Sequence, residues 1–209
     1  MPEPLADDPV AVPVLSSELV FAGKVWDVRR DRFEYPGGQI TREYVAHTGA
    51  VAVLALDEQD RVLLVKQYRH PIMARDWELP AGLLDIDGEH PLLAAQRELG
   101  EEADLVAADW HLLSEFFSSP GGSDEPIRVY LARGLTATAE AFERTEEEAE
   151  LEKRWVGLDD AAAAVLERRV HNSILAIGVL AACASRAGGW ASLGDASSPW
   201  PWHPKLRRK

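Results

Sequence analysis

The sequence predicts an α/β fold preceded by a small antiparallel β-module. Three observations support this fold class. Apolar and polar residues alternate in short runs over residues 19–49, two apolar runs without alternation occupy residues 50–56 and 62–65, and apolar residues recur at helical spacing after Pro91 and again after Leu158. The chain has 209 residues, 46% of them hydrophobic, so it can bury one substantial core.

The N-terminal part of the chain is expected to hold a short lead-in followed by the β-module. Four prolines before Val14 predict a lead-in over residues 1–18 that packs weakly, with ordered structure from near Leu19. Residues 19–45 contain short alternating runs that are interrupted by the turn signal "YPGG". This pattern favours antiparallel strands.

The rest of the chain alternates between predicted strands and helices. Two buried strands are expected around the charged turn "DEQD", because Val, Ala and Leu fill both sides of each run. Pro91 is a suitable first residue for the helix in "LLAAQRELGEEA". A strand, the loop "SSPGGSDE", a second strand and a short strand at "KRWV" follow. Two helices are then separated at His171 and Asn172, with Asn172 as N-cap and the pair Gly188-Gly189 as stop. Residues 188–209 form a tail without clear periodicity.

The charge balance and the single cysteine exclude several classes of protein. A formal net charge of −13 argues against general affinity for nucleic acid or for an anionic membrane. Cys183 lies in an apolar run, which favours a small buried side chain over a reactive thiol, and one cysteine forms no intramolecular disulfide. The N-terminus is acidic and Pro-rich, and no run of about 18 apolar residues occurs. We therefore expect a cytoplasmic protein.

The segment "QRELGEEADL" places three carboxylates on one helical face. At about 100° per residue, Glu98, Glu101 and Glu102 project to the same side. Like charges at this spacing destabilise a helix, so the face is either solvated or compensated by a cation. Arg97 can pair with Glu101, and carboxylates without nearby His or Cys ligands suit Mg²⁺ better than zinc. The residues thus predict a Mg²⁺-dependent site for a phosphate-bearing molecule.

The segment Gly82–Leu105, "GLLDIDGEHPLLAAQRELGEEADL", resembles the sequence box of the Nudix hydrolases. Glu89 stands eight positions before Arg97, as the box requires, and the Arg-Glu-apolar-x-Glu-Glu core is present. Two positions depart from the box: Gly82 is one residue too early, and Asp104 replaces the closing glycine. Both are positions of backbone geometry, so we interpret them as a longer loop and an altered helix end, where Asp tolerates the left-handed conformation.

The resemblance implies a Nudix fold, in which a mixed β-sheet is sandwiched between helices, over residues 46–187. It assigns Glu98 and Glu102 as metal ligands and Glu101 as a further ligand, with the backbone carbonyl of Ala81 as an additional one. Arg97 and Glu89 would orient these ligands. The implied cofactor is Mg²⁺, with Mn²⁺ as the alternative, at two or more ions per site.

Further residues resemble the ADP-ribose pyrophosphatase subfamily. Pro120 lies 15 positions beyond Leu105, and "VKQYRHP" and "WELPAG" flank the start of the box. This resemblance implies hydrolysis of ADP-ribose to AMP and ribose 5-phosphate by a homodimer with a shared site, in which residues 19–45 form the dimer. Such a pocket needs an aromatic face for adenine, cations for two phosphates and polar groups for the ribose. Trp26 is the candidate for the face, and Arg42 and Arg69 are the candidates for the cations. The candidates near the ribose are Glu78, Pro120, Ser123 and Asp124. Core packing is the alternative role for Trp26.

The resemblance also places a general base on a late loop. Here "RTEEEAELE" supplies five glutamates, and spacing selects none of them. Glu147 is the preferred base and Glu148 the next candidate, whereas a solvated acidic loop is the plain alternative. Two rival functions stay open: hydrolysis of another nucleoside-diphosphate sugar, and a non-catalytic sensor of ADP-ribose.

Overall fold

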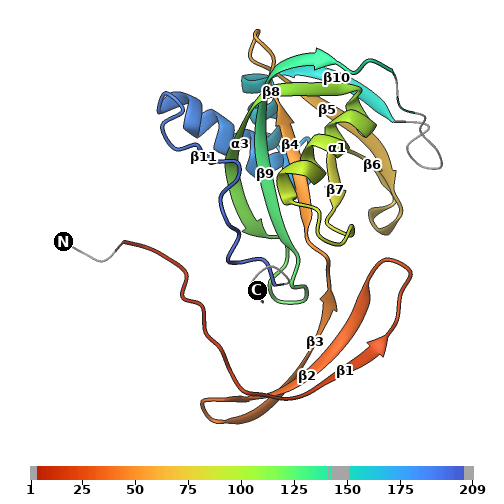
Figure 1. The fold of residues 1–209 in the computed structure, drawn as a ribbon, viewed down its shortest axis with the longest axis vertical. Helices are drawn as coiled ribbons and strands as arrows, with labels where there is room; N and C mark the ends of the chain where they lie inside the picture. The colour runs from red at the N-terminus through yellow and green to blue at the C-terminus, as the bar shows by residue number, and fades with distance from the viewer. Residues whose placement is uncertain (1–3, 141, 143–150, 205–209) are drawn as a thin grey trace. The chain divides into compact units, whose positions relative to one another are not determined.

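The computed structural model describes residues 4–140, 142 and 151–204. The chain divides into two compact units, one formed by Met1–His47 with Ser119–Asp124 and the other by Thr48–Ser118 with Glu125–Lys209. Figure 1 shows the elements of both. We describe each unit by itself.

The first unit is a three-stranded antiparallel sheet in the order β1-β2-β3. Its strands are β1 (Val14–Phe21), β2 (Asp27–Tyr35) and β3 (Gly38–Ala46). Gly37 and Gly38 adopt positive φ angles of 105° and 132° in the hairpin between β2 and β3, as the "YPGG" signal predicts. Strand β1 begins five residues before Leu19, because the backbone from Val14 pairs with β2. The predicted lead-in over residues 1–18 is therefore too long.

The second unit contains two sheets. A five-stranded sheet has the order β11-β8-β9-β4-β7, and a three-stranded sheet has the order β10-β5-β6. Strands β4 and β9 run parallel and the other pairs are antiparallel, so the larger sheet is mixed. The bounds are β4 (Ala50–Ala55), β5 (Arg61–Arg69), β6 (Ala74–Glu78), β7 (Ala81–Leu83), β8 (Leu105–Phe117), β9 (Pro126–Ala137), β10 (Glu152–Gly157) and β11 (Gly194–Asp195), with a short 3₁₀ helix at His70–Ile72.

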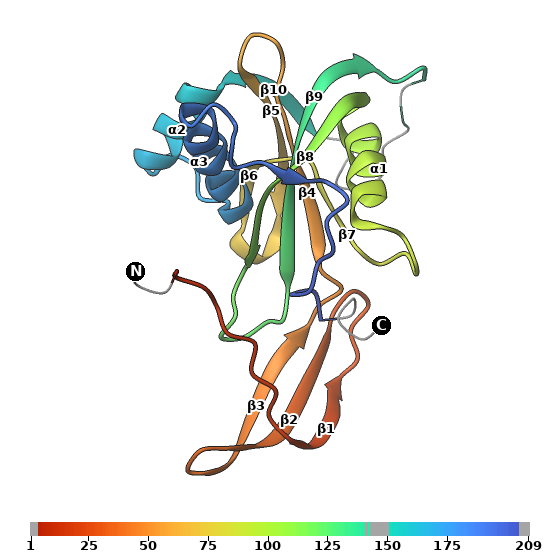
Figure 2. The ribbon, with the colours of Figure 1, turned by 60° about the vertical axis from the view of Figure 1, so that its left-hand side comes forward.

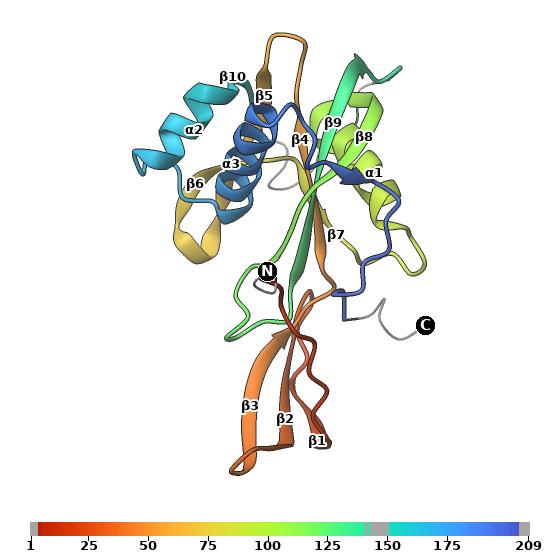
Figure 3. The same ribbon diagram turned by 90° about the vertical axis from the view of Figure 1, so that its left-hand side faces the viewer.

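Helices cover both faces of the mixed sheet. Helix α1 (Pro91–Ala103) lies on one face, and α2 (Leu158–Leu166) and α3 (Ser173–Ala187) lie on the other (Figures 2 and 3). Successive residues of β4 enter two separate cores: Leu54 packs with residues of α2 and α3, whereas Val53 packs with Leu99 of α1. A strand buried on both faces needs no polar alternation. The predicted fold class is confirmed.

The predicted helix ends are also confirmed. Helix α1 starts at Pro91. The N–H at the first position of a helix has no intrahelical partner, so a proline costs no hydrogen bond there. Asn172 caps α3, and its side-chain oxygen accepts a hydrogen bond of 3.0 Å from the Leu175 N–H. Gly188 is the C-cap of the same helix.

The C-terminal tail packs on the sheet of the second unit, to which it belongs. Strand β11 pairs with β8, and the side chains of Trp200 and His203 are buried. The Arg128 guanidinium donates to the carbonyls of Ser198 and Pro199 at 2.9 and 3.2 Å. No helix among the described residues is long and apolar enough to cross a membrane.

Candidate active site

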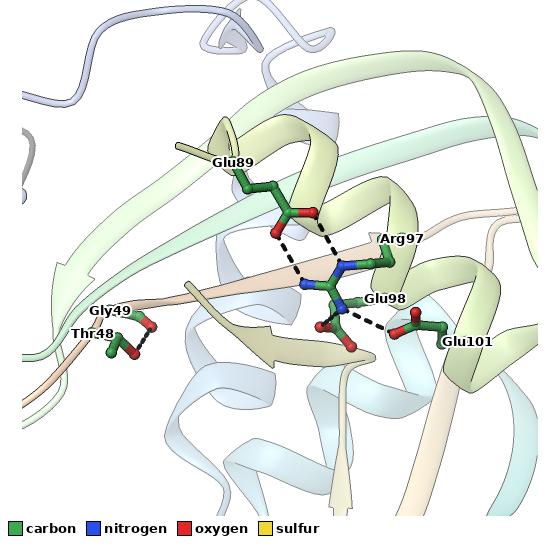
Figure 4. A network of polar contacts seen from close by, with 6 residues as sticks. All are labelled: Thr48, Gly49, Glu89, Arg97, Glu98 and Glu101. Carbon is green, nitrogen blue, oxygen red and sulfur yellow. Dashed lines mark hydrogen bonds and ion pairs between the residues drawn. The ribbon is translucent and has the colours of Figure 1, made fainter. Parts of the chain in front are cut away.

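Arg97 is the centre of a cluster of carboxylates on α1 and on the loop before it. Its Nε and Nη2 atoms each lie 3.1 Å from an oxygen of Glu89, and Nη1 lies 2.5 Å from Glu98 and 3.0 Å from Glu101 (Figure 4). The guanidinium fork therefore binds both carboxylate oxygens of Glu89. This arrangement compensates part of the like charge on the helix, and the orienting role of Arg97 and Glu89 stays a prediction.

The cluster leaves an excess of negative charge. One guanidinium contacts three carboxylates. The hydrogen bonds from Arg97 to Glu89 are the largest cause that raises the pKa of Arg97 above its ordinary value. Burial lowers this pKa, whereas the charge of Glu98 and the hydrogen bonds to Glu98 and Glu101 raise it further. Arg97 is consequently a fixed cation, and it neutralises only part of the charge around it.

Glu98 and Glu102 face strand β7. The Ala81 N–H donates to an oxygen of Glu102 at 3.0 Å, and Glu102 is only 5% exposed. The Glu98 carboxylate lies directly against Gly82. A Cβ atom added at Gly82 would be 2.0 Å from the Glu98 carboxyl carbon. Gly82 thus provides space for a glutamate, which the sequence interpretation of a longer loop did not include. For Ala81, the described contact is made by its N–H, and the role of its carbonyl stays a prediction.

The chemistry of these residues fits a hard divalent cation. As placed, no group of three or more His, Cys, Asp or Glu side chains among residues 4–140, 142 and 151–204 is arranged around a metal position. The carboxylates instead point to Arg97 and to the Ala81 N–H. Carboxylate oxygens are nonetheless the ligands that Mg²⁺ and Mn²⁺ take, and the Gly82 cradle lets Glu98 approach β7 closely.

The altered end of the box has the predicted conformation. Asp104 is the C-cap of α1 with φ 58° and ψ 37°, in the left-handed region. Its N–H bonds to the carbonyls of Gly100 and Leu99. Asp therefore occupies the backbone position that the box gives to glycine.

Arg69 and Glu78 form a bidentate ion pair. The Arg69 Nε and Nη2 atoms lie 2.7 and 2.6 Å from the two oxygens of Glu78, which also accepts from Gln67 at 3.3 Å. Glu78 is buried, whereas the Arg69 side chain is 44% exposed. The sequence assigned these two residues to different parts of the substrate, and the structure brings them together.

The remaining substrate-binding candidates belong to the first unit. Trp26 is 47% exposed and its ring centroid is 5.6 Å from that of His47, so core packing is not its role. The His47 N–H donates to Asp124 at 2.7 Å, and the Ser123 hydroxyl donates to the Val45 carbonyl at 3.4 Å. These bonds fix the loop of Ser119–Asp124, which includes Pro120, on β3.

Three predicted residues, Arg42, Glu147 and Glu148, have not yet been located. The Arg42 guanidinium donates to the Thr41 carbonyl at 2.8 Å, and its side chain is exposed. The contact between the Trp26 and His47 rings was not predicted, because a single histidine near a glycine carries no local signal. Glu147 and Glu148 lie outside the described residues.

Comparisons with known proteins extend this description. The model of the NUDIX domain matches residues 46–176. The ADP-ribose pyrophosphatase of Mycobacterium tuberculosis is 46% identical over 175 residues, which are 83% of this chain and 84% of that protein. The ADP-ribose pyrophosphatase of Bacillus subtilis is 39% identical over 160 residues, 76% of this chain and 85% of that protein.

A solved structure supports the fold. It is described as "Crystal structure of ADP compounds hydrolase", and it has a TM-score of 0.72 with 20% identity over 88% of this chain and 98% of that chain. The mixed sheet between helices agrees with the family match, and the match and the relatives show that the protein is a hydrolase. The chain belongs to the NUDIX family, whose hydrolases generally use divalent metal ions.

Proposed function

We propose that this protein hydrolyses the pyrophosphate bond of ADP-ribose and releases AMP and ribose 5-phosphate. The observation that carries the proposal is the set of box glutamates that Arg97 and β7 orient on α1. The identity of 46% to an ADP-ribose pyrophosphatase supports the choice of substrate.

In this reaction a water oxygen bonds to one phosphorus, and the bond from that phosphorus to the bridging oxygen breaks. The bridging oxygen leaves with the electron pair, and the proton of the water goes to a base. When bound, Mg²⁺ or Mn²⁺, at two or more ions per site, supplies positive charge next to the phosphate oxygens. Glu98 and Glu102 would hold these ions with Glu101 and the Ala81 carbonyl.

Arg97 and Glu89 have a positioning role in the proposal. The bidentate bond to Glu89 fixes the plane of the guanidinium, which in turn limits the rotamers of Glu98 and Glu101. Ligands that are held before the substrate arrives need less reorganisation during the reaction.

Glu147 is the proposed general base, and Glu148 is the alternative. A glutamate from the acidic stretch would take the proton of the attacking water, a contribution of about 10²–10⁴-fold in rate. Among the described glutamates of the box, Glu89, Glu98 and Glu101 already bind Arg97, and Glu102 binds the Ala81 N–H. These contacts favour a base from outside the box.

Several side chains are proposed to contact the substrate. The exposed Trp26 ring suits stacking on adenine, and the exposed guanidinium of Arg42 suits a phosphate. Arg69 keeps exposed surface for a phosphate while Glu78 fixes its orientation. Pro120, Ser123 and Asp124 belong to the loop proposed for the ribose.

A homodimer is part of the proposal. Strand β1 is exposed along its whole length in the single chain, and its apolar residues Leu19 and Phe21 are 50% and 61% exposed. Apolar side chains at this density on one strand are typical of a surface that a second copy covers. Trp26 and Arg42 would then serve the partner's site.

Release of AMP tests the function. Purified protein should release AMP from ADP-ribose with Mg²⁺, and it should turn over ADP-glucose and GDP-mannose more slowly. Faster turnover of either of those compounds would assign the site to another nucleoside-diphosphate sugar. Tight binding of ADP-ribose without AMP release would favour a sensor, although the box glutamates are all present.

A further inference from the structure

His203 is a buried histidine in the C-terminal tail, beyond residue 176, where the family match ends. It is only 2% exposed, and its Nε2 atom lies 3.0 Å from the Thr48 carbonyl oxygen. Because a carbonyl oxygen only accepts hydrogen bonds, Nε2 carries the proton of this bond. A buried polar group is costly without a partner, so the bond favours this position of the imidazole.

Gly49 provides the space for the imidazole. It has φ 85°, in the region that favours glycine, and a Cβ atom added there would lie 2.5 Å from His203 Nε2. The ring therefore occupies the side of Gly49 on which any other residue carries its side chain. The bond to the Thr48 oxygen and the fit against Gly49 together fix the peptide group between these two residues.

This peptide group leads directly into the strand pair β4 and β7. The Gly49 carbonyl accepts a bond of 3.0 Å from the Leu84 N–H, just after β7, and a bond of 3.2 Å from the Thr48 hydroxyl (Figure 4). Strand β7 has three residues and stands at the end of the sheet order, so among the described strands it pairs with β4 alone. The bond from Leu84 closes one end of this short pair. At the other end the Val53 N–H donates to the Pro80 carbonyl at 2.8 Å.

Both proposed metal-ligand glutamates lie against β7. The Ala81 N–H donates to Glu102 at 3.0 Å, and the Glu98 carboxylate lies against Gly82. Ala81 and Gly82 are paired in register with β4. A shift of β7 at its Leu84 end therefore moves the backbone that these two carboxylates contact.

The tail holds His203 in this place through several contacts. The Arg128 guanidinium, which is almost fully buried, donates to the carbonyls of Ser198 and Pro199. It also lies 4.6 Å from the centroid of the Trp200 ring. The His203 N–H donates to the Trp200 carbonyl at 3.1 Å, and the ring centroids of these two residues are 5.0 Å apart. The imidazole thus belongs to a segment that is anchored on the sheet.

We propose that His203 is a positioning residue, which fixes β7 through the Thr48–Gly49 peptide and so keeps the two glutamates that face this strand in place for a divalent cation. This inference rests on the proposed function, in which Glu98 and Glu102 bind the metal. Ligands that are fixed before the substrate arrives need less reorganisation during the reaction. The effect of His203 should be smaller than that of a direct change at Gly82, because it acts through one peptide and one backbone bond.

The variant His203→Phe keeps a planar ring and removes the hydrogen-bond donor. We expect kcat for AMP release to fall about 3- to 30-fold, less than the roughly 10²-fold loss that a displacement of about 1 Å causes. The dissociation constant for Mn²⁺, measured by calorimetry without substrate, should rise about 3- to 10-fold, while KM for ADP-ribose should change little. His203→Gln offers an amide N–H to the Thr48 carbonyl and should recover most of both losses.

Hydrogen exchange locates the effect in the strand pair. In the metal-free protein, the Leu84 amide, which bonds to Gly49, should exchange several-fold faster in His203→Phe than in the wild type. The Val53 amide, at the other end of the pair, should exchange at an unchanged rate. General destabilisation would instead increase both rates.

His111→Phe is the matched control. His111 is also a half-buried histidine of the second unit, and it lies in β8 opposite Asp195 of β11. The same substitution at this position leaves the Thr48–Gly49 peptide untouched. It should therefore leave kcat, Mn²⁺ binding and the two exchange rates unchanged.

Gly49→Ala gives a second test, which also decides the matter if His203→Phe does not fold. The added methyl group should expel the imidazole, whose Nε2 atom would be 2.5 Å away, and the strain at φ 85° is the same with and without His203. His203→Ala should therefore lower kcat in the wild-type background but cause almost no further loss in Gly49→Ala.

Each other outcome overturns the inference. Unchanged Mn²⁺ binding or unchanged Leu84 exchange in His203→Phe would show that the imidazole does not fix β7. Equal losses of kcat from His203→Ala in both backgrounds, or no recovery in His203→Gln, would assign the effect to something other than the bond to Thr48. Absence of AMP release by the wild-type protein would refute the proposed function alone, because Mn²⁺ binding and exchange are measured without substrate and still decide the role of His203.

Discussion

Gly82→Ala should displace Glu98, a proposed metal ligand, without changing any titratable residue. The added Cβ atom would lie 2.0 Å from the Glu98 carboxyl carbon, whereas ordinary van der Waals contact begins at 3.4 Å. The carboxylate must therefore move by more than about 1 Å, and a shift of this size costs about 10²-fold in rate. This loss corresponds to about 2.7 kcal/mol at 1.36 kcal/mol per decade.

The assay is AMP release from ADP-ribose over a range of Mg²⁺ concentrations. Gly82→Ala should lower kcat/KM about 100-fold and raise the Mg²⁺ concentration for half-maximal rate, because Glu98 would hold the ion less well. Gly188→Ala is the control, since its nearest neighbour, the Ser185 carbonyl oxygen, would be 3.5 Å away. If both variants keep wild-type rates and Mg²⁺ dependence, the assignment of Glu98 at the Gly82 cradle is wrong.

Three further predictions concern the metal, the base and the dimer. EDTA should abolish activity while circular dichroism stays unchanged, because the carboxylate cluster lies outside the two apolar cores; activity after complete chelation would exclude a metal. Glu102→Gln should lower turnover by orders of magnitude with partial recovery at high Mg²⁺, whereas Glu147→Gln should lose about 10²–10⁴-fold without recovery. If only Glu148→Gln is impaired, Glu148 is the base. If neither Glu147→Gln nor Glu148→Gln is impaired, a glutamate of the box must be the base. Removal of residues 1–45 should abolish the dimer in sedimentation and lower activity, and an active monomer would contradict the shared site.

Local patterns predicted the elements of the second unit well. The runs around "DEQD" became β4 and β5 because residues on both faces of β4 enter a core. Pro91 and Asn172 mark helix starts through bonds that lie within four residues, so the sequence around them contains the full signal. The spacing of four residues likewise predicted the pair of Arg97 with Glu101, because such residues are neighbours on a helix.

Contacts between distant residues were not predictable in the same way. The close approach of Glu98 to Gly82 depends on how β7 lies against α1, and no local pattern specifies that distance. The bond from the Phe142 N–H to Asp104 joins residues 38 positions apart. The tail from Ser198 to His203 gave no periodic signal, because irregular chain is fixed by single hydrogen bonds and ring contacts and not by a repeated stripe.

The packing of the tail sets the minimal length of a usable hydrolase unit. The family match ends at residue 176, but the Arg128 guanidinium lies 4.6 Å from the Trp200 ring, and His203 Nε2 is 3.0 Å from the Thr48 carbonyl oxygen. A protein trimmed to the matched residues would lose these contacts and most of α3, including the core residues Val179 and Ala182. Fusion partners and affinity tags at the C-terminus should therefore be separated from His203 by a spacer, and shortened versions should be judged by stability before their catalytic rates are compared.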